Sequence, residues 1–266
     1  MTAEPAAGSG VGGRGAQRRV RVFEDLAAMS NAVAGALARA AEAAVAERGR
    51  FVIALAGGET PRALYRVLAE RYGDRAFWGA THVFFGDERC VPPDDPASNY
   101  AMAEHELLSR VAVSDDRVYR VVGEAVPDDA ARVYDALLHR TLGGGGDGAA
   151  AATFDVALLG VGADGHTASL FPGDDAALDE HERWALAVRA PASYAPRDRI
   201  TLTLPALNAS RAVWVLAAGA GKAPAVRAAL AADDAGAEEI PASLVHGTAE
   251  TVWHLDRAAA EGAGTG

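Results

Sequence analysis

The sequence predicts an α/β protein built on a doubly wound, mostly parallel sheet with helices on both faces. Short apolar runs, which are typical of buried strands, alternate with longer stretches of helical periodicity over almost the whole chain. Several of these runs end directly in glycine-rich turns, as strands do where they lead into the ligand-binding loops of open α/β sheets. Together the two observations indicate a Rossmann-like three-layer sandwich.

The chain opens with an edge strand and a long helix. Residues 18–23 alternate basic and apolar side chains, which predicts a strand at the edge of the sheet. Asp25 can cap the Ala-rich helix that follows, which is expected to run to about Arg48. Further strands are expected at 51–56, 82–85, 117–121, 154–159, 184–188, 199–204 and 213–217, and further helices at 62–72, 98–108, 127–142 and 223–230, before 241–245 and 251–255 close the chain.

These elements form one predicted domain, residues 19–258. Residues 1–18 are expected to be a disordered N-terminal tail, and residues 259–266 a flexible C-terminal tail. The run 143–152 contains only Gly and Ala apart from one Asp, and is expected to be a flexible surface loop inside the domain. A chain of 266 residues is long enough to bury a large core.

Charge and composition narrow the range of partners. A formal net charge of -11 argues against general nucleic-acid binding and against attraction to anionic membranes, although a few basic groups in a cleft could still hold a small anion. No apolar segment is long enough to span a bilayer, and the N-terminus lacks the apolar core of a signal peptide. The single cysteine, Cys90, allows no internal disulfide. We expect a cytoplasmic protein, monomeric or a small homo-oligomer, without nucleic-acid or membrane partners.

The stretch 154–173 carries the strongest chemical signal. A buried-strand pattern is followed by glycines and then by Asp164-Gly165-His166, so the histidine is expected at the carboxyl end of a strand. Glycine permits a sharp turn there and lets a ligand approach the backbone. Histidine is suited to proton transfer near neutral pH. Taken alone, however, a histidine after such a turn could equally be an exposed loop residue.

A second glycine-rich turn follows the strand at 51–56. Gly57 and Gly58 lead through Thr60 and Pro61 into a predicted helix, and Pro61 suits a first helical turn because its missing N–H is not needed there. Backbone N–H groups at such a helix N-terminus, with the Thr60 hydroxyl, can bind an anion. The alternative is a plain connection between strand and helix.

Two basic positions could add to an anion site. Arg89, in Asp87-Glu88-Arg89, could face an anion while one of the carboxylates orients it, or the three residues could form a solvated ion-pair cluster. Lys222 is the only lysine in the chain and follows a Gly-Ala-Gly turn. It does not complete a Walker P-loop, because no Ser or Thr follows it, and it could also be an exposed lysine of a first helical turn.

Several of these motifs together resemble the 6-phosphogluconolactonase family. The string Gly-x-Gly-x-Asp-Gly-His-Thr-Ala-Ser-Leu-Phe-Pro-Gly at 160–173 is similar to the family signature. The segments at 55–65, 87–89 with 98–100, 199–208 and 219–223 are similar to other family motifs in the same order. The resemblance covers about residues 20–256. Glu59 stands where the family usually has Ser, and residues 191–197 depart from the usual Pro- and Lys-rich run.

The resemblance implies hydrolysis of 6-phospho-D-glucono-1,5-lactone to 6-phosphogluconate, the second step of the oxidative pentose phosphate pathway. His166 is then expected to activate a water molecule, and Asp164 to hold its ring or shape the turn. The oxyanion would be stabilised by backbone N–H groups of the turn around Gly165 or by an arginine such as Arg89. The phosphate is expected to bind at Gly57, Gly58 and Thr60, together with Arg89, Arg199 and Lys222. The sequence leaves open which of these cations contacts the phosphate and which contacts the reacting carbonyl. No metal and no cofactor is expected.

Two other functions remain open. The first is a glucosamine-6-phosphate deaminase-like isomerase, whose signature also contains Asp-Gly-His but continues Ile-Ala-Phe-Asn-Glu-Pro. Here Thr-Ala-Ser-Leu-Phe-Pro follows the histidine, which removes the Asn-Glu pair and favours the lactonase. The second is a sugar-phosphate-binding regulator without turnover. It would need no general base, so the intact His166 argues against it, and no DNA-binding segment is evident.

Overall fold

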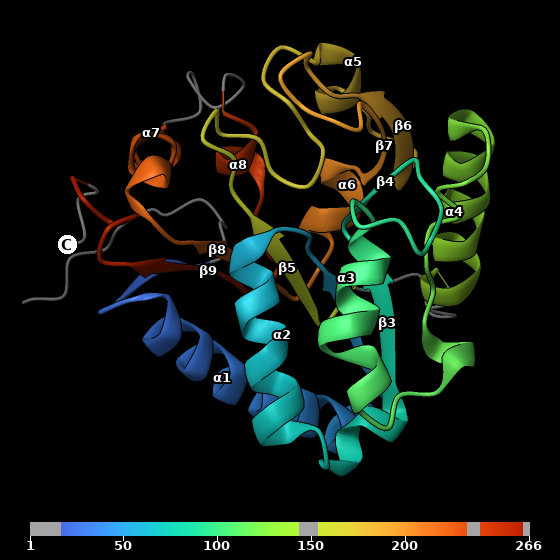
Figure 1. Ribbon diagram of the computed structural model, residues 1–266, viewed down its shortest axis with the longest axis vertical. Helices are drawn as coiled ribbons and strands as arrows, with labels where there is room; N and C mark the ends of the chain where they lie inside the picture. The colour runs from blue at the N-terminus through green and yellow to red at the C-terminus, as the bar shows by residue number, and fades with distance from the viewer. Residues whose placement is uncertain (1–16, 144–153, 233–239, 263–266) are drawn as a thin grey trace, which may run out of the picture.

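The computed structural model describes residues 17–143, 154–232 and 240–262. Its main sheet is parallel throughout and has six strands. This sheet confirms the predicted doubly wound α/β class (Figure 1). The strands lie in the order β1 (Gln17–Phe23), β9 (Glu250–Asp256), β8 (Ala212–Ala217), β5 (Val156–Gly160), β2 (Phe51–Leu55) and β3 (Thr81–Phe85).

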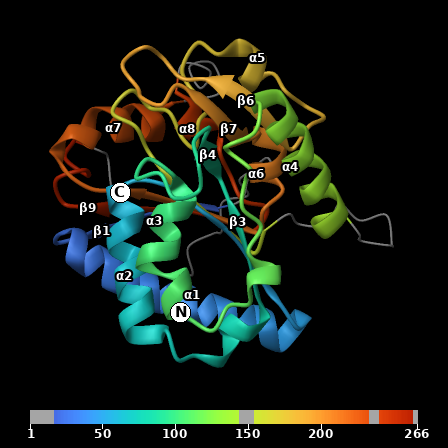
Figure 2. The same ribbon diagram turned by 45° about the vertical axis from the view of Figure 1, so that its right-hand side comes forward.

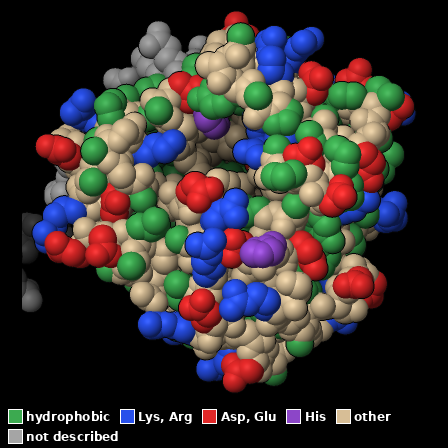
Figure 3. All heavy atoms as spheres, in the orientation of Figure 1, with side chains coloured by type: hydrophobic (Ala, Val, Ile, Leu, Met, Phe, Trp, Pro, Cys, Tyr) green, Lys and Arg blue, Asp and Glu red, His purple; other side chains and the backbone are tan. Residues whose placement is uncertain are grey.

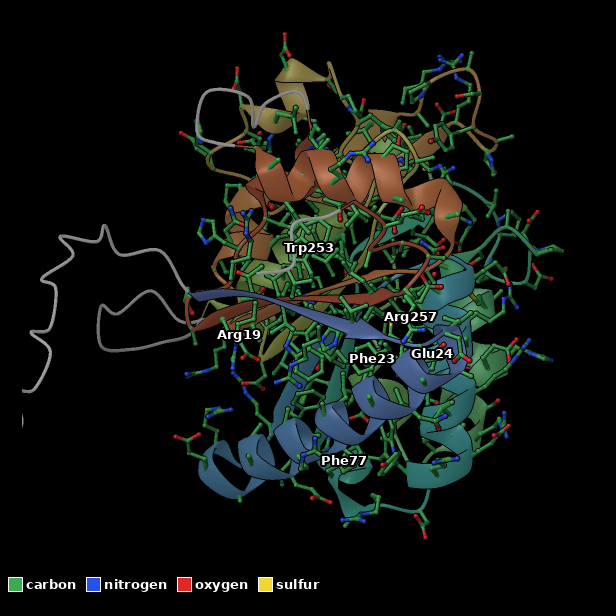
Figure 4. The ribbon with its side chains drawn as sticks, turned by 90° about the vertical axis from the view of Figure 1, so that its left-hand side faces the viewer. Arg19, Phe23, Glu24, Phe77, Trp253 and Arg257 are labelled. Carbon is green, nitrogen blue, oxygen red and sulfur yellow. The ribbon has the colours of Figure 1, made fainter. Side chains whose placement is uncertain are left out.

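Helices cover both faces of this sheet, so the molecule has three layers. One face packs against α1 (Leu26–Arg48), α2 (Glu59–Tyr72) and α3 (Asn99–Glu106), and the other against α4 (Pro127–Leu142), α7 (Ala223–Ala231) and α8 (Pro241–Leu244). Figure 4 shows the sheet edge-on between α7 and α1, with Trp253 and Phe77 in the two opposite apolar layers. Both side chains are buried. The shorter helical segments are Ala76–Ala80, Leu108–Arg110, Asp115–Arg117, Asp175–Leu178 (α5), Leu204–Asn208 (α6) and Ala220–Lys222 (η4).

A second, antiparallel sheet lies beside the first and was not predicted. It consists of β4 (Asp87–Arg89), β7 (Asp198–Leu202) and β6 (Ala185–Arg189), and it lies next to α4 (Figures 1 and 2). No strand was expected at residues 87–89, and the other two segments were expected to belong to the mostly parallel sheet. Only residues 190–197 join β6 to β7, which is too short for the crossover that parallel neighbours require.

The predicted strand at 117–121 is also wrong. A 3₁₀ turn occupies Asp115–Arg117, and only Val118 pairs with the main sheet, through a single bridge to Val83. The chain then turns away at Gly123, whose backbone passes so close to the Arg89 carbonyl that an added Cβ would lie 2.5 Å from it. The segment therefore leaves the sheet edge after one bridge.

Helix boundaries follow the capping residues. Asp25 caps α1 as predicted, because the backbone N–H of Ala28 donates to its Oδ1 at 2.8 Å. The helix α2 begins at Glu59, three residues earlier than expected, so the second glycine turn merges with the helix N-terminus.

The C-terminal end of the chain also differs from the expected boundary of the domain. Turns continue past β9 and Ala259 is buried, so a tail beginning at 259 was wrong for the described part.

The predicted tails and loop lie largely outside the described residues. Residues 1–16 and 263–266 are not described, and neither is 144–153, which holds most of the low-complexity run. The strand β1 includes Gln17 and Arg18, which the predicted tail had contained. Along this edge, ion pairs join Arg19 to Glu250 and Arg257 to Glu24 (Figure 4). Within the described ranges, none of the helices is both long and apolar enough to cross a membrane.

The packing around β9 predicts how stability depends on pH. His254 is buried between Phe23 and Trp214, and neither ring nitrogen has a hydrogen-bond partner among the described residues. Burial, with a smaller effect from the Arg21 charge, lowers its pKa from 6.5 to about 4. The unfolded chain therefore binds more protons than the folded chain between these two pH values, and stability falls as pH falls through that window.

Replacing His254 with phenylalanine should remove this dependence. Between pH 7 and pH 5 the free energy of unfolding of the variant should fall by about 2 kcal/mol less than that of the parent. Urea unfolding at the two pH values measures the difference, with the exposed His246→Phe as the matched control. If His254→Phe and the parent lose stability equally, His254 does not titrate in the way the burial implies.

Candidate active site

A cavity of about 170 Å³ opens beyond the carboxyl ends of β2 and β5. Figure 3 shows this face of the molecule hollowed, with a histidine and basic side chains around the hollow. Parallel α/β sheets bind their ligands at this end of the strands. The residues that line the cavity are Ala56, Gly57, Gly58, Asp87, Arg89, Gly160, Val161, Gly162, His166, Ala168, Phe171, Tyr194, Arg199 and Lys222.

His166 and Asp164 form a hydrogen-bonded pair in the turn after β5. His166 Nδ1 lies 2.6 Å from Asp164 Oδ1, and the backbone N–H of His166 also donates to this oxygen, at 3.2 Å. The carboxylate thus selects the tautomer that carries its proton on Nδ1. Nε2 is left with a free lone pair, and it makes no hydrogen bond to any described residue.

The electrostatics of the pair keep Asp164 ionised. Partial burial would favour the neutral acid, but hydrogen bonds from His166 and Tyr194 outweigh it and hold the pKa of Asp164 well below its usual range. Asp164 itself does not line the cavity. It therefore acts on a bound ligand through its neighbours, chiefly the imidazole ring, rather than by direct contact.

Two glycines shape this turn in different ways. At Gly162 an added Cβ would lie 2.1 Å from His166 Nδ1 and 2.4 Å from Asp164 Oδ1, so the pair rests directly against the backbone. Gly165 has φ +87°, and an added Cβ would lie 2.9 Å from Ile240 Cγ2. Gly165 does not line the cavity, so its place is in the turn rather than against a ligand.

The second glycine turn forms the opposite wall. Gly57 and Gly58 line the cavity, and an added Cβ at Gly57 would lie 2.1 Å from Asn99 Oδ1. No side chain caps the N-terminus of α2, so N–H groups of its first turn remain available to an anion. Thr60 does not line the cavity. Glu59 is exposed and pairs with Arg62 at 3.2 Å, so its carboxylate does not occupy the proposed phosphate position.

Two arginines from the antiparallel sheet supply positive charge. Arg89 on β4 and Arg199 on β7 are cross-strand partners, and both line the cavity. Arg199 is 5% exposed, and burial followed by the Arg89 charge lowers its pKa. Arg89 Nε is buried and makes no hydrogen bond to a described residue. Two adjacent guanidinium groups with unused donors favour an anion between them.

Within the described residues, neither Asp87 nor Glu88 bonds to the Arg89 guanidinium, so the alternative in which one of them orients it finds no support in the hydrogen bonds. Glu88 is buried and accepts from the backbone N–H groups of Asn99 at 2.7 Å and Tyr100 at 2.8 Å, so it caps α3. Asp87 accepts from Asn99 Nδ2 at 2.9 Å and from Ser169 Oγ at 2.7 Å. Because both carboxylates are buried, residues 87–89 do not form a solvated ion-pair cluster. The Asp87 carboxylate also lines the cavity.

Lys222 completes the set of cations. It lies in the short η4 turn after β8 and lines the cavity, and its ammonium group makes no hydrogen bond or ion pair with the described part of the chain. Partial burial lowers its pKa, with the Asp164 charge opposing the effect. The turn is held by Asp256, whose carboxylate oxygens accept from the N–H of Gly219 at 3.0 Å and 2.9 Å.

Most of the sequence-predicted site residues therefore meet in one cavity. His166, Arg89, Arg199, Lys222, Gly57 and Gly58 line it, Asp164 reaches it through His166, and Thr60 and Gly165 do not line it. Sequence reasoning missed Tyr194, Phe171 and Asp87 as cavity residues. Among the described residues no three His, Cys, Asp or Glu side chains are grouped so that they could hold a metal ion.

A larger hollow, of about 860 Å³, lies between α4, β6 and the segment before α5. It contains no histidine, and two of its arginines are already paired, Arg132 with Asp129 and Arg183 with Glu180. The smaller cavity combines a histidine with a free lone pair and cations with unused donors. We therefore take the smaller cavity as the candidate active site.

The fold and this cavity define a class: a doubly wound α/β protein whose His–Asp pair lies beside three cations, suited to an anionic substrate. The family model of glucosamine-6-phosphate isomerases/6-phosphogluconolactonase matches residues 24–253. The chain belongs to this family.

Individual relatives agree with this assignment. A 6-phosphogluconolactonase of Mycobacterium tuberculosis is 39% identical over 246 residues, which cover 91% of this chain and 96% of the relative. The structure of a 6-phosphogluconolactonase from Thermotoga maritima superposes with a TM-score of 0.78 at 28% identity, covering 91% of this chain and 100% of that one. A monomeric glucosamine-6-phosphate deaminase shares the fold, with a TM-score of 0.72 at 24% identity over 91% of this chain and 99% of its own. The fold alone therefore does not separate the two activities.

Proposed function

We propose that the chain hydrolyses 6-phospho-D-glucono-1,5-lactone to 6-phospho-D-gluconate, the second step of the oxidative pentose phosphate pathway. The observation that carries the proposal is the Asp164–His166 pair, with Nε2 free, in the same cavity as Arg89, Arg199 and Lys222. The names of the relatives at high coverage support the same reaction.

His166 is the general base of the proposed mechanism. The lactone is an activated ester, so a water molecule can attack C1 directly if a base takes its proton as the bond forms. Nε2 accepts that proton, and the Asp164 carboxylate on the other side of the ring stabilises the imidazolium that results. The proton then passes to the ring oxygen, which leaves C1 as the tetrahedral intermediate opens to the hydroxy acid.

The cations and the α2 N-terminus hold the substrate. The phosphate dianion binds charged donors in the cavity, and this anchors the sugar so that C1 faces His166. Arg89, Arg199 and Lys222, with the N–H groups after Gly58, supply more donors than one phosphate needs. A donor that does not bind the phosphate is therefore available to stabilise the oxyanion that forms at C1. The proposal includes no resident metal, no cofactor and a cytoplasmic location.

One contact favours the lactonase over a deaminase. In the deaminase-like signature a glutamate stands five residues after the histidine, where this chain has Phe171. The Phe171 ring packs against the His166 imidazole, with 4.8 Å between ring centroids. An apolar ring at this point supplies neither the acid nor the base that an amino-sugar isomerisation would require.

A comparison of two substrates tests the proposal. The parent protein should convert freshly prepared 6-phosphogluconolactone faster than its spontaneous hydrolysis, with the product measured by coupling to 6-phosphogluconate dehydrogenase. It should release no ammonia from glucosamine 6-phosphate. The lactone rate should be unchanged after treatment with EDTA, because the nucleophile is water activated by an imidazole. Ammonia release without lactone turnover would contradict the proposal, and loss of activity in EDTA that a divalent ion restores would overturn its metal-free mechanism.

A further inference from the structure

Tyr194 lies against the His–Asp pair from a segment that departs from the family pattern. Its hydroxyl donates to Asp164 Oδ2 at 2.9 Å, and its oxygen lies 3.3 Å from His166 Nδ1. Its ring meets the imidazole edge-on, with centroids 5.2 Å apart and an interplanar angle of 89°. It also contacts the Phe171 ring at 5.4 Å and lines the cavity.

The loop that carries Tyr194 is fixed at its base. The backbone N–H of Ala190 donates to the Arg197 carbonyl at 2.8 Å, and Arg197 Nε donates back to the Ala190 carbonyl at 2.9 Å. Within the loop, the N–H of Tyr194 donates to the Pro191 carbonyl at 3.0 Å. Arg199 Nε donates to the carbonyl of Pro196 at 2.7 Å, which ties the same loop to a cation of the cavity.

These contacts leave the pair few ways to move. One carboxylate oxygen of Asp164 accepts from the imidazole and the other accepts from Tyr194, so rotation of the carboxylate would break both hydrogen bonds. The imidazole has an aromatic ring on two sides, Phe171 and Tyr194. Without the hydroxyl, Asp164 Oδ2 would have no donor among the described residues, and the Asp164 side chain is already 34% exposed to solvent.

We propose that Tyr194 is a positioning residue for His166: its hydroxyl holds the Asp164 carboxylate, and its ring holds the imidazole so that Nε2 faces the reacting carbon. The inference rests on the proposed lactone hydrolysis. Burial, followed by the hydrogen bond to Asp164, raises the pKa of Tyr194 to about 12, so the hydroxyl remains a donor over the whole range in which the enzyme would be assayed.

Tyr194→Phe removes the hydroxyl and keeps the ring. We expect kcat for lactone hydrolysis to fall about 5- to 20-fold, the effect of losing one hydrogen bond to a carboxylate, while KM and product affinity stay within about twofold. Tyr194→Leu, which also removes the ring, should lower kcat further. The matched control is Tyr119→Phe, since Tyr119 is also half-buried and its hydroxyl contacts a histidine, His82 Nδ1 at 3.0 Å, outside the cavity.

Two further measurements separate positioning from a general structural role. In a His166→Ala background, Tyr194→Phe should leave the residual rate unchanged, because Tyr194 acts through the imidazole. The motion of the His166 ring, followed by ¹³C NMR relaxation of its ring carbons, should increase in Tyr194→Phe, because the carboxylate that holds the ring then has one hydrogen-bond donor fewer. The other charged groups near the pair, Lys222 and Arg199, are unchanged in this variant.

The outcomes distinguish this inference from the proposed function. If the parent does not turn over the lactone, the proposed function fails, and the NMR relaxation measurement alone decides whether Tyr194 holds the imidazole. If the parent is active but Tyr194→Phe keeps the kcat and the His166 ring motion of the parent, the inference is overturned. A fall in kcat that is equally large in Tyr119→Phe, or that persists in the His166→Ala background, would also overturn it.

Discussion

Replacing His166 with alanine should lower kcat for lactone hydrolysis about 10²–10⁴-fold, which is the usual contribution of a positioned general base. The affinity for 6-phosphogluconate should change far less, because the cations that we propose to bind the phosphate lie elsewhere in the cavity wall. The two constants are obtained from saturation kinetics on fresh lactone and from product titration by calorimetry. His246→Ala is the matched control, since His246 is exposed and does not line the cavity.

The competing role for His166 gives the reverse pattern. A histidine that only binds phosphate would leave turnover at saturation largely intact in the alanine variant and would weaken product binding. Preserved kcat at saturating lactone would therefore mean that another group takes the proton from water. Asp87 would then be the next residue to replace, because it is a second titratable side chain in the cavity wall that can accept a proton.

Removing a cation from the cavity weakens product binding. Lys222→Ala and Arg199→Ala should each raise the dissociation constant of 6-phosphogluconate about 10- to 150-fold, as expected for a charge-assisted hydrogen bond of about 1.5–3 kcal/mol. The Lys222 ammonium has no hydrogen-bond or ion-pair partner among the described residues, so its removal should leave the stability of the fold unchanged. Arg199 is 5% exposed and bonds to Pro196, so thermal unfolding of that variant is measured alongside binding.

Arg189→Ala is the control for both variants. Arg189 lies on β6 of the same antiparallel sheet as Arg199, but its side chain is 68% exposed and does not line the cavity. Its loss should leave product affinity unchanged. Should Lys222→Ala and Arg199→Ala both bind the product as tightly as Arg189→Ala does, the phosphate site lies elsewhere.

The elements that local patterns encode were predictable. Buried strands such as 51–55 read as continuous apolar runs, and Asp25 marks the start of α1 with a capping side chain. The glycine turns after β2 and β5 place Gly57 and His166 at the same end of a parallel sheet. The two residues therefore lie close together because their strands are parallel, without any further contact between distant segments. These parts of the site follow from residues close to each other in sequence.

The missed parts depend on pairing between distant segments. The strand β4 has three polar residues, and its pairing with β7 across more than a hundred residues of chain has no local signal. That pairing buries Asp87 and Glu88 and sets Arg89 beside Arg199. Tyr194 reaches Asp164 from a loop in which Pro191, Ser193 and Pro196 indicate turns but no residue indicates a contact with Asp164. The exclusion of Thr60 depends likewise on where α2 begins.

The central claim is that the His166 imidazole accepts a proton from the attacking water, and the pH dependence of kcat tests it most directly. Asp164 stays ionised because its pKa is held well below the usual range, and Tyr194, with a pKa of about 12, stays neutral. Neither of these two groups therefore changes its charge on the acid side of neutral pH. The parent should lose activity with falling pH along a single-proton curve, after subtraction of spontaneous hydrolysis, and the residual activity of His166→Ala should lack this curve. The same acid limb in His166→Ala would contradict the account, because the group that gains the proton could not then be His166.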